Sequence, residues 1–185
     1  MSQKDYSVAI VENLLRKPNH IRGIAKELGT NQTTVARKVK QLYDGNIVDF
    51  RQEGRNKVFA LKSTLEAKQQ ACIVELHKAV ESVKKYPRLR VVFEKIRGNS
   101  RIHLAVLFGS YAKGIAGKDS DIDIYIDTDD RSIKKDVELV DSRISVKIGK
   151  YDRNSLLIRE IGKNHVIIKG VEEYYEKSGF FAQTA

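Results

Sequence analysis

The sequence predicts an α+β protein of two parts joined by a helical connector. Three stretches with helical periodicity, followed by two alternating strands, fill the first 62 residues. A helix-start signal at Ser63 opens a connector that extends to about residue 99. From residue 100 onward, apolar strands interleave with short helices, which is typical of a small mixed sheet with flanking helices. We therefore expect domains at 1–62 and 100–185, with the connector 63–99 between them.

The N-terminal part begins with three short amphipathic helices. Their apolar residues recur at helical spacing, and they are Val8, Ile10, Val11, Leu14 and Leu15, then Ile21, Ile24, Ala25 and Leu28, then Val35, Val39 and Leu42. Gly29 is placed to end the second helix, and Thr30 or Asn31 can cap the third. Two strands, at 47–50 and 57–61, surround a turn at Gly54. This order predicts a helix-turn-helix followed by a hairpin, which is a winged helix.

The polar face of the third helix is a candidate DNA-reading surface. Its hydroxyl, amide and guanidinium groups suit base edges and phosphates in the major groove. We expect DNA-binding side chains at Thr33, Thr34, Arg37, Lys40 and Gln41 on this helix, and at Arg51, Arg55 and Lys57 on the wing. The first 62 residues resemble the winged-helix domains of prokaryotic, especially archaeal, transcriptional regulators. The alternative is a protein-interaction or dimerisation module with the same residues on a solvated surface.

The distribution of charge supports a polyanion partner such as double-stranded DNA. The net charge is +10, and the first hundred residues hold 20 lysines and arginines against 10 acids, while the rest hold 14 against 14. A basic half joined to a neutral half favours a nucleic-acid-binding module attached to a second function. An excess of lysine on a merely solvated surface is the alternative.

Other features of the composition narrow the class of protein. No apolar run approaches the ~20 residues of a membrane helix, so we expect a cytoplasmic protein without a membrane partner. Cys72 is the one cysteine, which excludes a disulfide framework, and the four histidines show no metal-ligand spacing.

The connector should consist of two helices. Ser63 and Glu66 fit a capping box, and the first helix should stop near Lys85, before Pro87. A second helix is expected over 88–98. The first helix carries an apolar seam that could pair with a second copy, although packing against its own domains is favoured. A homodimer would present two winged helices to two half-sites.

The motif richest in chemistry lies in the C-terminal part. Gly109-Ser110 follows an apolar strand at 102–108, and Asp121-x-Asp123 opens a second strand in which isoleucines alternate with polar residues. Alternation puts both aspartates on one face, ~6.6 Å apart, where carboxylates can share a cation such as Mg²⁺. Gly109 gives the turn conformational freedom, and Ser110 would lie near a helix start, where N–H groups attract anions. A plain turn before an acidic, solvated strand is the alternative.

These residues resemble the signature of the nucleotidyltransferase superfamily, which includes DNA polymerase beta and the small kanamycin-modifying enzymes. The resemblance covers about residues 100 to 178. It implies a minimal nucleotidyltransferase fold, with a triphosphate, ATP being the expected one, on the Gly-Ser turn and Mg²⁺ on Asp121 and Asp123. We expect the nucleotide-binding residues to be Gly109, Ser110, Lys113, Ser120 and Lys147. The resemblance implies that the two aspartates are the catalytic residues.

One acid of that signature is missing. In the superfamily a third carboxylate on a neighbouring strand completes the metal site, but the strand at 143–148 places Ser145 there, with Lys147 two residues on. Asp127 lies ~13 Å from Asp123 along the strand, and other nearby acids fall in loops or helix ends. Our leading hypothesis is therefore a DNA-binding regulator whose second domain binds a nucleotide with Mg²⁺, whether or not it catalyses transfer. The alternatives are an active enzyme that transfers a nucleoside monophosphate, AMP first, to a protein partner as antitoxin-like relatives do, and a DNA binder with a relic domain.

Overall fold

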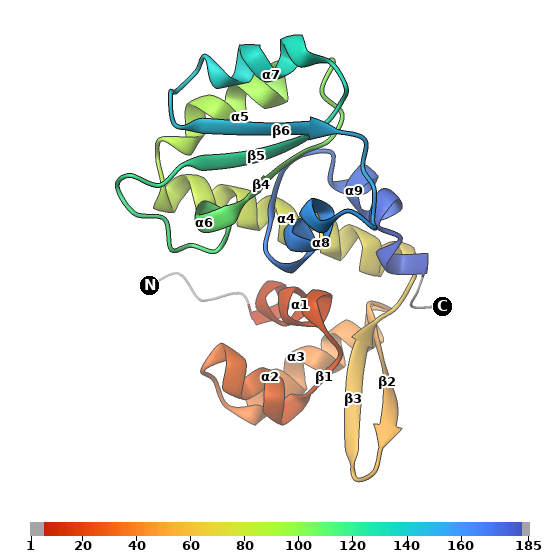
Figure 1. The fold of residues 1–185 in the computed structure, drawn as a ribbon. Helices are drawn as coiled ribbons and strands as arrows, with labels where there is room; N and C mark the ends of the chain where they lie inside the picture. Colours follow the sequence, from red (N-terminus) through yellow and green to blue (C-terminus); the bar gives the residue numbers. More distant parts are fainter. Residues whose placement is uncertain (1–5, 183–185) are drawn as a thin grey trace. The chain divides into compact units, whose positions relative to one another are not determined.

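The computed structural model describes residues 6–182, and its contacts divide the chain into two compact units. Unit 1 comprises residues 1–74 together with 179–185, and unit 2 comprises residues 75–178. The structure is α+β throughout, with helices and a small sheet in each unit (Figure 1). Within the described part of the chain, no helix is long and apolar enough to cross a membrane.

Three helices open unit 1, and they match the predicted helix-turn-helix. They are α1 (Tyr6–Arg16), α2 (Ile21–Leu28) and α3 (Gln32–Asp44). Gly29 ends α2 in the left-handed conformation, with φ of 61°, and a glycine adopts this without steric cost. Asn31 caps α3, because its side-chain oxygen accepts a hydrogen bond of 2.8 Å from the Thr34 N–H. The apolar residues of α3 that the periodicity identified are buried.

The sheet of unit 1 completes a winged helix. It contains β1 (Asn19–His20), β2 (Val48–Glu53) and β3 (Asn56–Leu61) in the order β1-β3-β2, all antiparallel. Strand β1 was not predicted, because two residues are too few to show alternation. The ring of Phe50 lies between those of Tyr43 and Phe59, with centroid distances of 5.8 and 5.7 Å. One face of the hairpin thereby packs against α3.

The connector consists of α4 (Leu65–Lys85) and α5 (Leu89–Gly98), as expected, but α4 belongs to both units. Thr64 provides the N-terminal hydrogen bond, since its hydroxyl accepts from the Ala67 N–H at 3.3 Å. Ser63 instead donates to the Phe181 carbonyl at 2.6 Å. The proposed seam is divided, because Ala79 is buried while Leu65 and Leu76 are exposed. The expected domain limits at 62 and 99 stay a prediction.

Unit 2 is built on a mixed sheet of four strands. They are β4 (Ala105–Phe108), β5 (Ile122–Asp127), β6 (Ile144–Gly149) and β7 (Val166–Lys169), in the order β6-β5-β4-β7. Strands β5 and β6 are parallel, and the other pairs are antiparallel. Strand β4 is shorter than predicted, because residues 102–104 lie outside the sheet although Ile102 and Leu104 are buried.

Helices flank this sheet. The isoleucines of β5 pack in one core with apolar residues of α5 and α7 (Arg131–Glu138) (Figure 1). The alternate face carries Tyr125, whose ring meets Tyr151, which in turn meets Tyr174 of α9 (Val171–Ser178). The remaining helices are α6 (Gly109–Ala112), α8 (Leu156–Lys163) and a 3-10 turn, η1 (Phe180–Ala182). The sequence indicated that strands and short helices interleave beyond residue 100, but it did not identify α8, whose eight residues precede β7.

A buried acid anchors the last helix of unit 2 to α4. Glu75 is 2% exposed, its carboxylate accepts two hydrogen bonds from Lys78 at 2.8 and 3.0 Å, and the Tyr175 hydroxyl donates to it at 3.2 Å. Burial alone would raise the pKa of Glu75, but His165 and Lys78 together hold it below its usual value. The carboxylate is therefore ionised and satisfied inside the fold.

Replacing Glu75 tests how much this hydrogen-bond network contributes to the stability of the fold. Glu75→Ala leaves Lys78 and the Tyr175 hydroxyl without their acceptor, so the free energy of unfolding should fall by about 3 kcal/mol. Urea unfolding monitored by circular dichroism measures it. Glu172→Ala, at an exposed acid on α9, should change that free energy by less than about 0.5 kcal/mol. Equal effects of the two substitutions would contradict the assignment.

Candidate functional site

The Gly-Ser turn and the second aspartate meet at the end of β4. Phe108, the last residue of β4, pairs with Asp123 of β5, and Gly109 follows with φ of +71°. A Cβ on Gly109 would lie 2.3 Å from Oδ2 of Asp123. Only a residue without a side chain allows the carboxylate to approach the turn so closely.

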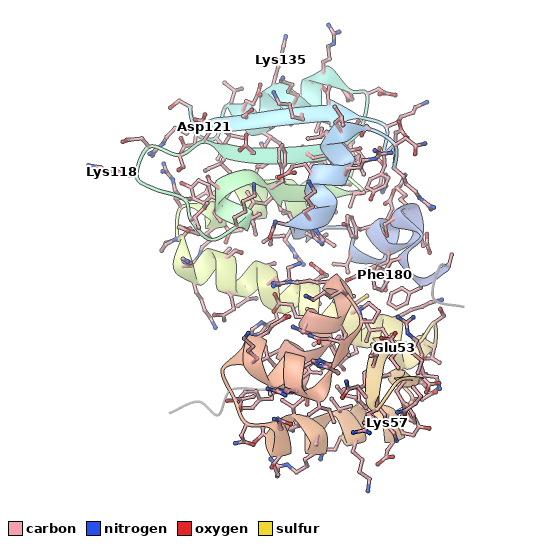
Figure 2. All side chains as sticks on the ribbon, turned by 60° about the horizontal axis from the view of Figure 1, so that its bottom comes forward. Glu53, Lys57, Lys118, Asp121, Lys135 and Phe180 are labelled. Carbon is pink, nitrogen blue, oxygen red and sulfur yellow. The ribbon has the colours of Figure 1, made fainter. Side chains whose placement is uncertain are left out.

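Four polar side chains share the face of the sheet beside this turn. Asp121 lies just before β5 and Asp123 within it, next to the loop that carries Lys118 (Figure 2). In the parallel pairing of β5 with β6, Ser145 stands opposite Asp123 and Lys147 opposite Tyr125. Because side chains alternate along a strand, Asp121, Asp123, Ser145 and Lys147 all point to the same side. The structure thus places the two aspartates on one face, as their spacing predicted, with Ser145 and Lys147 on the neighbouring strand.

The electrostatics of the two aspartates suit a bound cation. Burial, followed by the charge of Asp121, raises the pKa of Asp123, and Lys147 offsets part of this rise. Among the described residues, no ion pair or hydrogen bond involves the carboxylate of Asp121 or Asp123. Two crowded, unpaired carboxylates provide the hard oxygen ligands that a divalent ion prefers. Within the same part of the chain, no third acid, histidine or cysteine joins them in a metal-binding group.

The other expected nucleotide-binding residues have different surroundings. Ser110 lies in α6, a single turn whose start has no side-chain cap. Lys113, directly after α6, forms an ion pair of 3.1 Å with Glu160 of α8. Ser120 accepts a hydrogen bond of 2.9 Å from the Gly117 N–H and so shapes the loop before Asp121. Their roles toward a nucleotide stay predictions.

Four other acids near β5 have structural partners. Asp127 pairs with Lys177 at 2.7 Å, and Asp130 caps α7 through the Ser132 N–H. Asp152 accepts from the Asn154 N–H in a turn, and Asp141 pairs with Arg88 at 2.9 Å. Asp127 is the last residue of β5, whereas Asp130, Asp141 and Asp152 lie at the loop and helix-end positions that the sequence indicated.

Two residues that support the turn carried no signal in the sequence. Arg88, between α4 and α5, reaches both Asp141 and, at 3.4 Å, the hydroxyl of Tyr111 in α6. The ring of Tyr111 packs against Tyr86 at 4.9 Å between centroids. Glu160, the partner of Lys113, lies in the helix that was not predicted. Both contacts join residues more than twenty positions apart, which spacing cannot reveal.

The second candidate site is the outer face of α3 in unit 1. Thr33, Arg37, Lys40 and Gln41 are exposed, and Thr34 is half-buried. No ion pair involves Arg37 or Lys40 within the described residues. This face therefore offers a free guanidinium, a free ammonium and a side-chain amide, as the sequence predicted.

The wing divides its basic residues between two faces. Lys57 stands opposite Gln52 and lies 4.0 Å from the centre of the Phe50 ring, on the side of α3. Arg51 stands opposite Val58, on the other face, and pairs with Glu53 at 2.6 Å. Arg55 is exposed at the tip, next to Gly54. Lys57 and Arg51 therefore lie on opposite faces of the hairpin, and the DNA contacts expected of the wing residues stay predictions.

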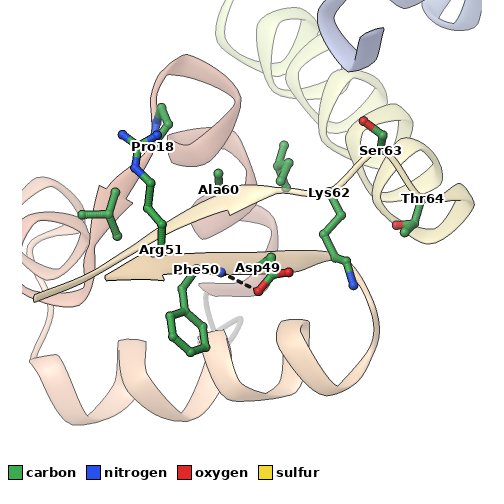
Figure 3. Close-up of a pocket in the computed structure, with 10 residues that line it drawn as sticks. Pro18, Asp49, Phe50, Arg51, Ala60, Lys62, Ser63 and Thr64 are labelled. Atoms are coloured by element: carbon green, nitrogen blue, oxygen red, sulfur yellow. Dashed lines mark hydrogen bonds between the residues drawn. The ribbon is translucent and has the colours of Figure 1, made fainter. Parts of the chain in front are cut away.

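An open cavity of about 560 Å³ occupies the face of the wing with Arg51 (Figure 3). Its apolar wall includes Pro18, Val58 and Ala60. Its polar rim is already engaged within the protein, since Lys62 donates to Asn46 and Asp49 accepts from the Phe50 N–H. The cavity therefore lacks the free, convergent polar groups of a ligand site.

Comparisons with known proteins agree with the site in unit 2. Residues 92–173 match the family model described as "Polymerase beta, Nucleotidyltransferase". The matched range contains Gly109, both aspartates and strands β4 to β7. The C-terminal region of this α+β chain therefore has the fold of a minimal nucleotidyltransferase domain and is similar to that family over residues 92–173.

For the N-terminal region the likeness to solved structures is weak. One match is a solution NMR structure of a homodimeric winged helix-turn-helix DNA-binding domain from Mycobacterium bovis, a possible ArsR-family transcriptional regulator. It has 21% identity, a TM-score of 0.35, and covers 44% of this chain and 72% of that one. A TM-score of 0.35 is too low to show a common fold, so the winged helix is identified from the helices and strand order of this chain itself. No curated protein matches the chain significantly.

The close approach of Gly109 to Asp123 can be tested by adding one methyl group. Gly109→Ala places a Cβ against Oδ2 of Asp123 at a positive φ, so the free energy of unfolding should fall by about 1–3 kcal/mol. Gly117→Ala is the matched control, because its Cβ would meet nothing closer than 3.9 Å. Thermal unfolding of both variants measures the difference. An unchanged midpoint for Gly109→Ala would contradict the contact.

Proposed function

We propose that this protein is a DNA-binding transcriptional regulator whose nucleotidyltransferase domain binds a nucleoside triphosphate with Mg²⁺, ATP being the first candidate. The observation that carries the nucleotide part is the pair Asp121 and Asp123, unpaired and packed against the turn at Gly109. Their crowding favours a divalent ion over an empty site at neutral pH.

The proposed roles follow from where each group lies. Asp121 and Asp123 hold the ion, which when bound supplies positive charge to the phosphate oxygens. Ser110 and the uncapped N–H groups at the start of α6 are placed to donate to the triphosphate, while Gly109 leaves room for it. Lys147, on the same face, adds a further positive charge.

Catalytic transfer is not part of the leading proposal. Ser145, a neutral residue, stands opposite Asp123 where a third acid would help to activate an attacking hydroxyl. The alternative, transfer of a nucleoside monophosphate, AMP first, to a protein partner, is favoured by the family match over residues 92–173. Labelled ATP separates the two, because covalent label on protein supports transfer and bound but uncleaved ATP supports a sensor.

The DNA part of the proposal rests on the free polar face of α3 together with Lys57. Both lie on the same side of the wing, so one duplex can meet the recognition helix and the hairpin at once. The excess of basic residues in the first hundred positions supports the same partner. Two copies of the chain could then read two half-sites.

Nucleotide binding is tested by removing the charges of the two aspartates. Asp121→Asn/Asp123→Asn keeps the size of both side chains but removes the ion's anionic ligands, so affinity for ATP with Mg²⁺ should fall at least ~10-fold. Titration calorimetry with and without Mg²⁺ measures it, and Asp129→Asn, at an exposed acid, is the control. Mg²⁺-dependent binding that survives in the double variant would overturn the proposed site.

DNA recognition is tested with three single substitutions. Arg37→Ala should cost ~1–3 kcal/mol on a selected site and less on random duplex, because this side chain faces the base edges. Lys57→Ala should weaken binding to both DNAs alike and should reduce the slope of log affinity against log salt concentration by about 1. Arg51→Ala, on the opposite face of the wing, should change neither the affinity nor this slope. Fluorescence anisotropy at several salt concentrations provides the data, and equal losses for all three variants would refute this orientation.

A further inference from the structure

Lys147 is an unpaired cation beside two unpaired carboxylates. It is exposed on β6, on the same face as Asp123, and no ion pair or hydrogen bond to its ammonium is found in the described part of the chain. Two other lysines near this sheet are engaged, since Lys177 pairs with Asp127 at 2.7 Å and Lys113 pairs with Glu160 at 3.1 Å. The free charge of Lys147 is thus available to a ligand of the aspartates.

The position of Lys147 sets how far it can reach. It lies one strand away from Asp123 and two residues further along, which places the two Cα atoms ~8 Å apart. A lysine side chain spans most of that distance. Within the described residues no direct ion pair joins Lys147 to Asp121 or Asp123, so both carboxylates keep their oxygens free for a metal ion.

The charges of the site favour one divalent ion over two. Two-metal sites place the ions ~3.5–4 Å apart, on either side of the reacting phosphate, and need enough carboxylates to offset their charge. Here two carboxylates carry two negative charges, Ser145 contributes none, and Lys147 contributes a positive one. A second divalent ion on this face would have no protein carboxylate of its own, because it would have to share Asp121 and Asp123 with the first ion, and it would be repelled by the ammonium.

We propose that Lys147 takes the place of a second metal ion, so that the domain binds a nucleoside triphosphate with a single Mg²⁺. This inference rests on the proposed function and specifies the composition of the same site. The ammonium contacts a phosphate oxygen, a role that lysine performs as a point charge. The site then holds the nucleotide firmly without a second ion to activate an acceptor hydroxyl, which makes it a sensor of nucleotide.

The test counts ions instead of measuring turnover. With a non-hydrolysable ATP analogue at saturation, Mn²⁺ bound per chain is measured by electron paramagnetic resonance. The wild-type protein should hold one ion. Lys147→Met should still hold one but bind the analogue about tenfold more weakly, since a charge-assisted contact is lost. Ser145→Asp/Lys147→Met restores an acid and removes the cation, and it should hold two ions.

Controls and contrary outcomes separate this inference from the proposed function. Lys150→Met, at an exposed lysine just beyond β6, should match wild type in ion count and affinity. Two ions in the wild-type protein, or unchanged affinity in Lys147→Met, would overturn the inference while leaving nucleotide binding intact. Absence of any Mn²⁺-dependent binding of the analogue by the wild-type protein would overturn the proposed function itself.

Discussion

The close approach of a carboxylate to a turn without a side chain organises the C-terminal domain. Asp123 can lie against Gly109 only because the pairing of β4 with β5 ends there and the chain turns with positive φ. The isoleucines of β5 fix this register, since a slip by one residue would move all of them from this core to the opposite face of the sheet. Hydrophobic packing on one face of the strand therefore determines where the charges on the other face lie.

Much of this arrangement could be predicted from the sequence, and the reasons are local. Periodicity revealed α1 to α5, Gly29 and Asn31 revealed the turn between α2 and α3, and the spacing of Asp121 and Asp123 revealed their common face. What could not be predicted depends on contacts between distant segments or on very short elements. Strand β1 has two residues, and the ion pair of Lys113 with Glu160 joins positions 47 residues apart.

In the wing, the number of basic residues does not show how they are distributed over its surface. Composition alone put Arg51 and Lys57 into one basic group, yet the hairpin register sends them to opposite faces. Arg51 is also engaged with Glu53, whereas Lys57 lies over an aromatic ring that α3 helps to hold. The free basic surface is smaller than the sum suggests and lies on the side of α3, so affinity in the proposed DNA complex should depend on few residues.

Because α4 is continuous across the two units, it determines where the chain can be truncated to prepare fragments. Its first half contributes the buried residues Ala67, Ala71 and Val74, and its second half contributes Glu75 and Ala79. A fragment that stops at residue 62 therefore discards part of the first unit's core, although the wing ends at Leu61. A fragment that begins after residue 85 lacks Glu75, which holds α9 in the second unit. Overlapping fragments that both retain the helix are the reasonable choice.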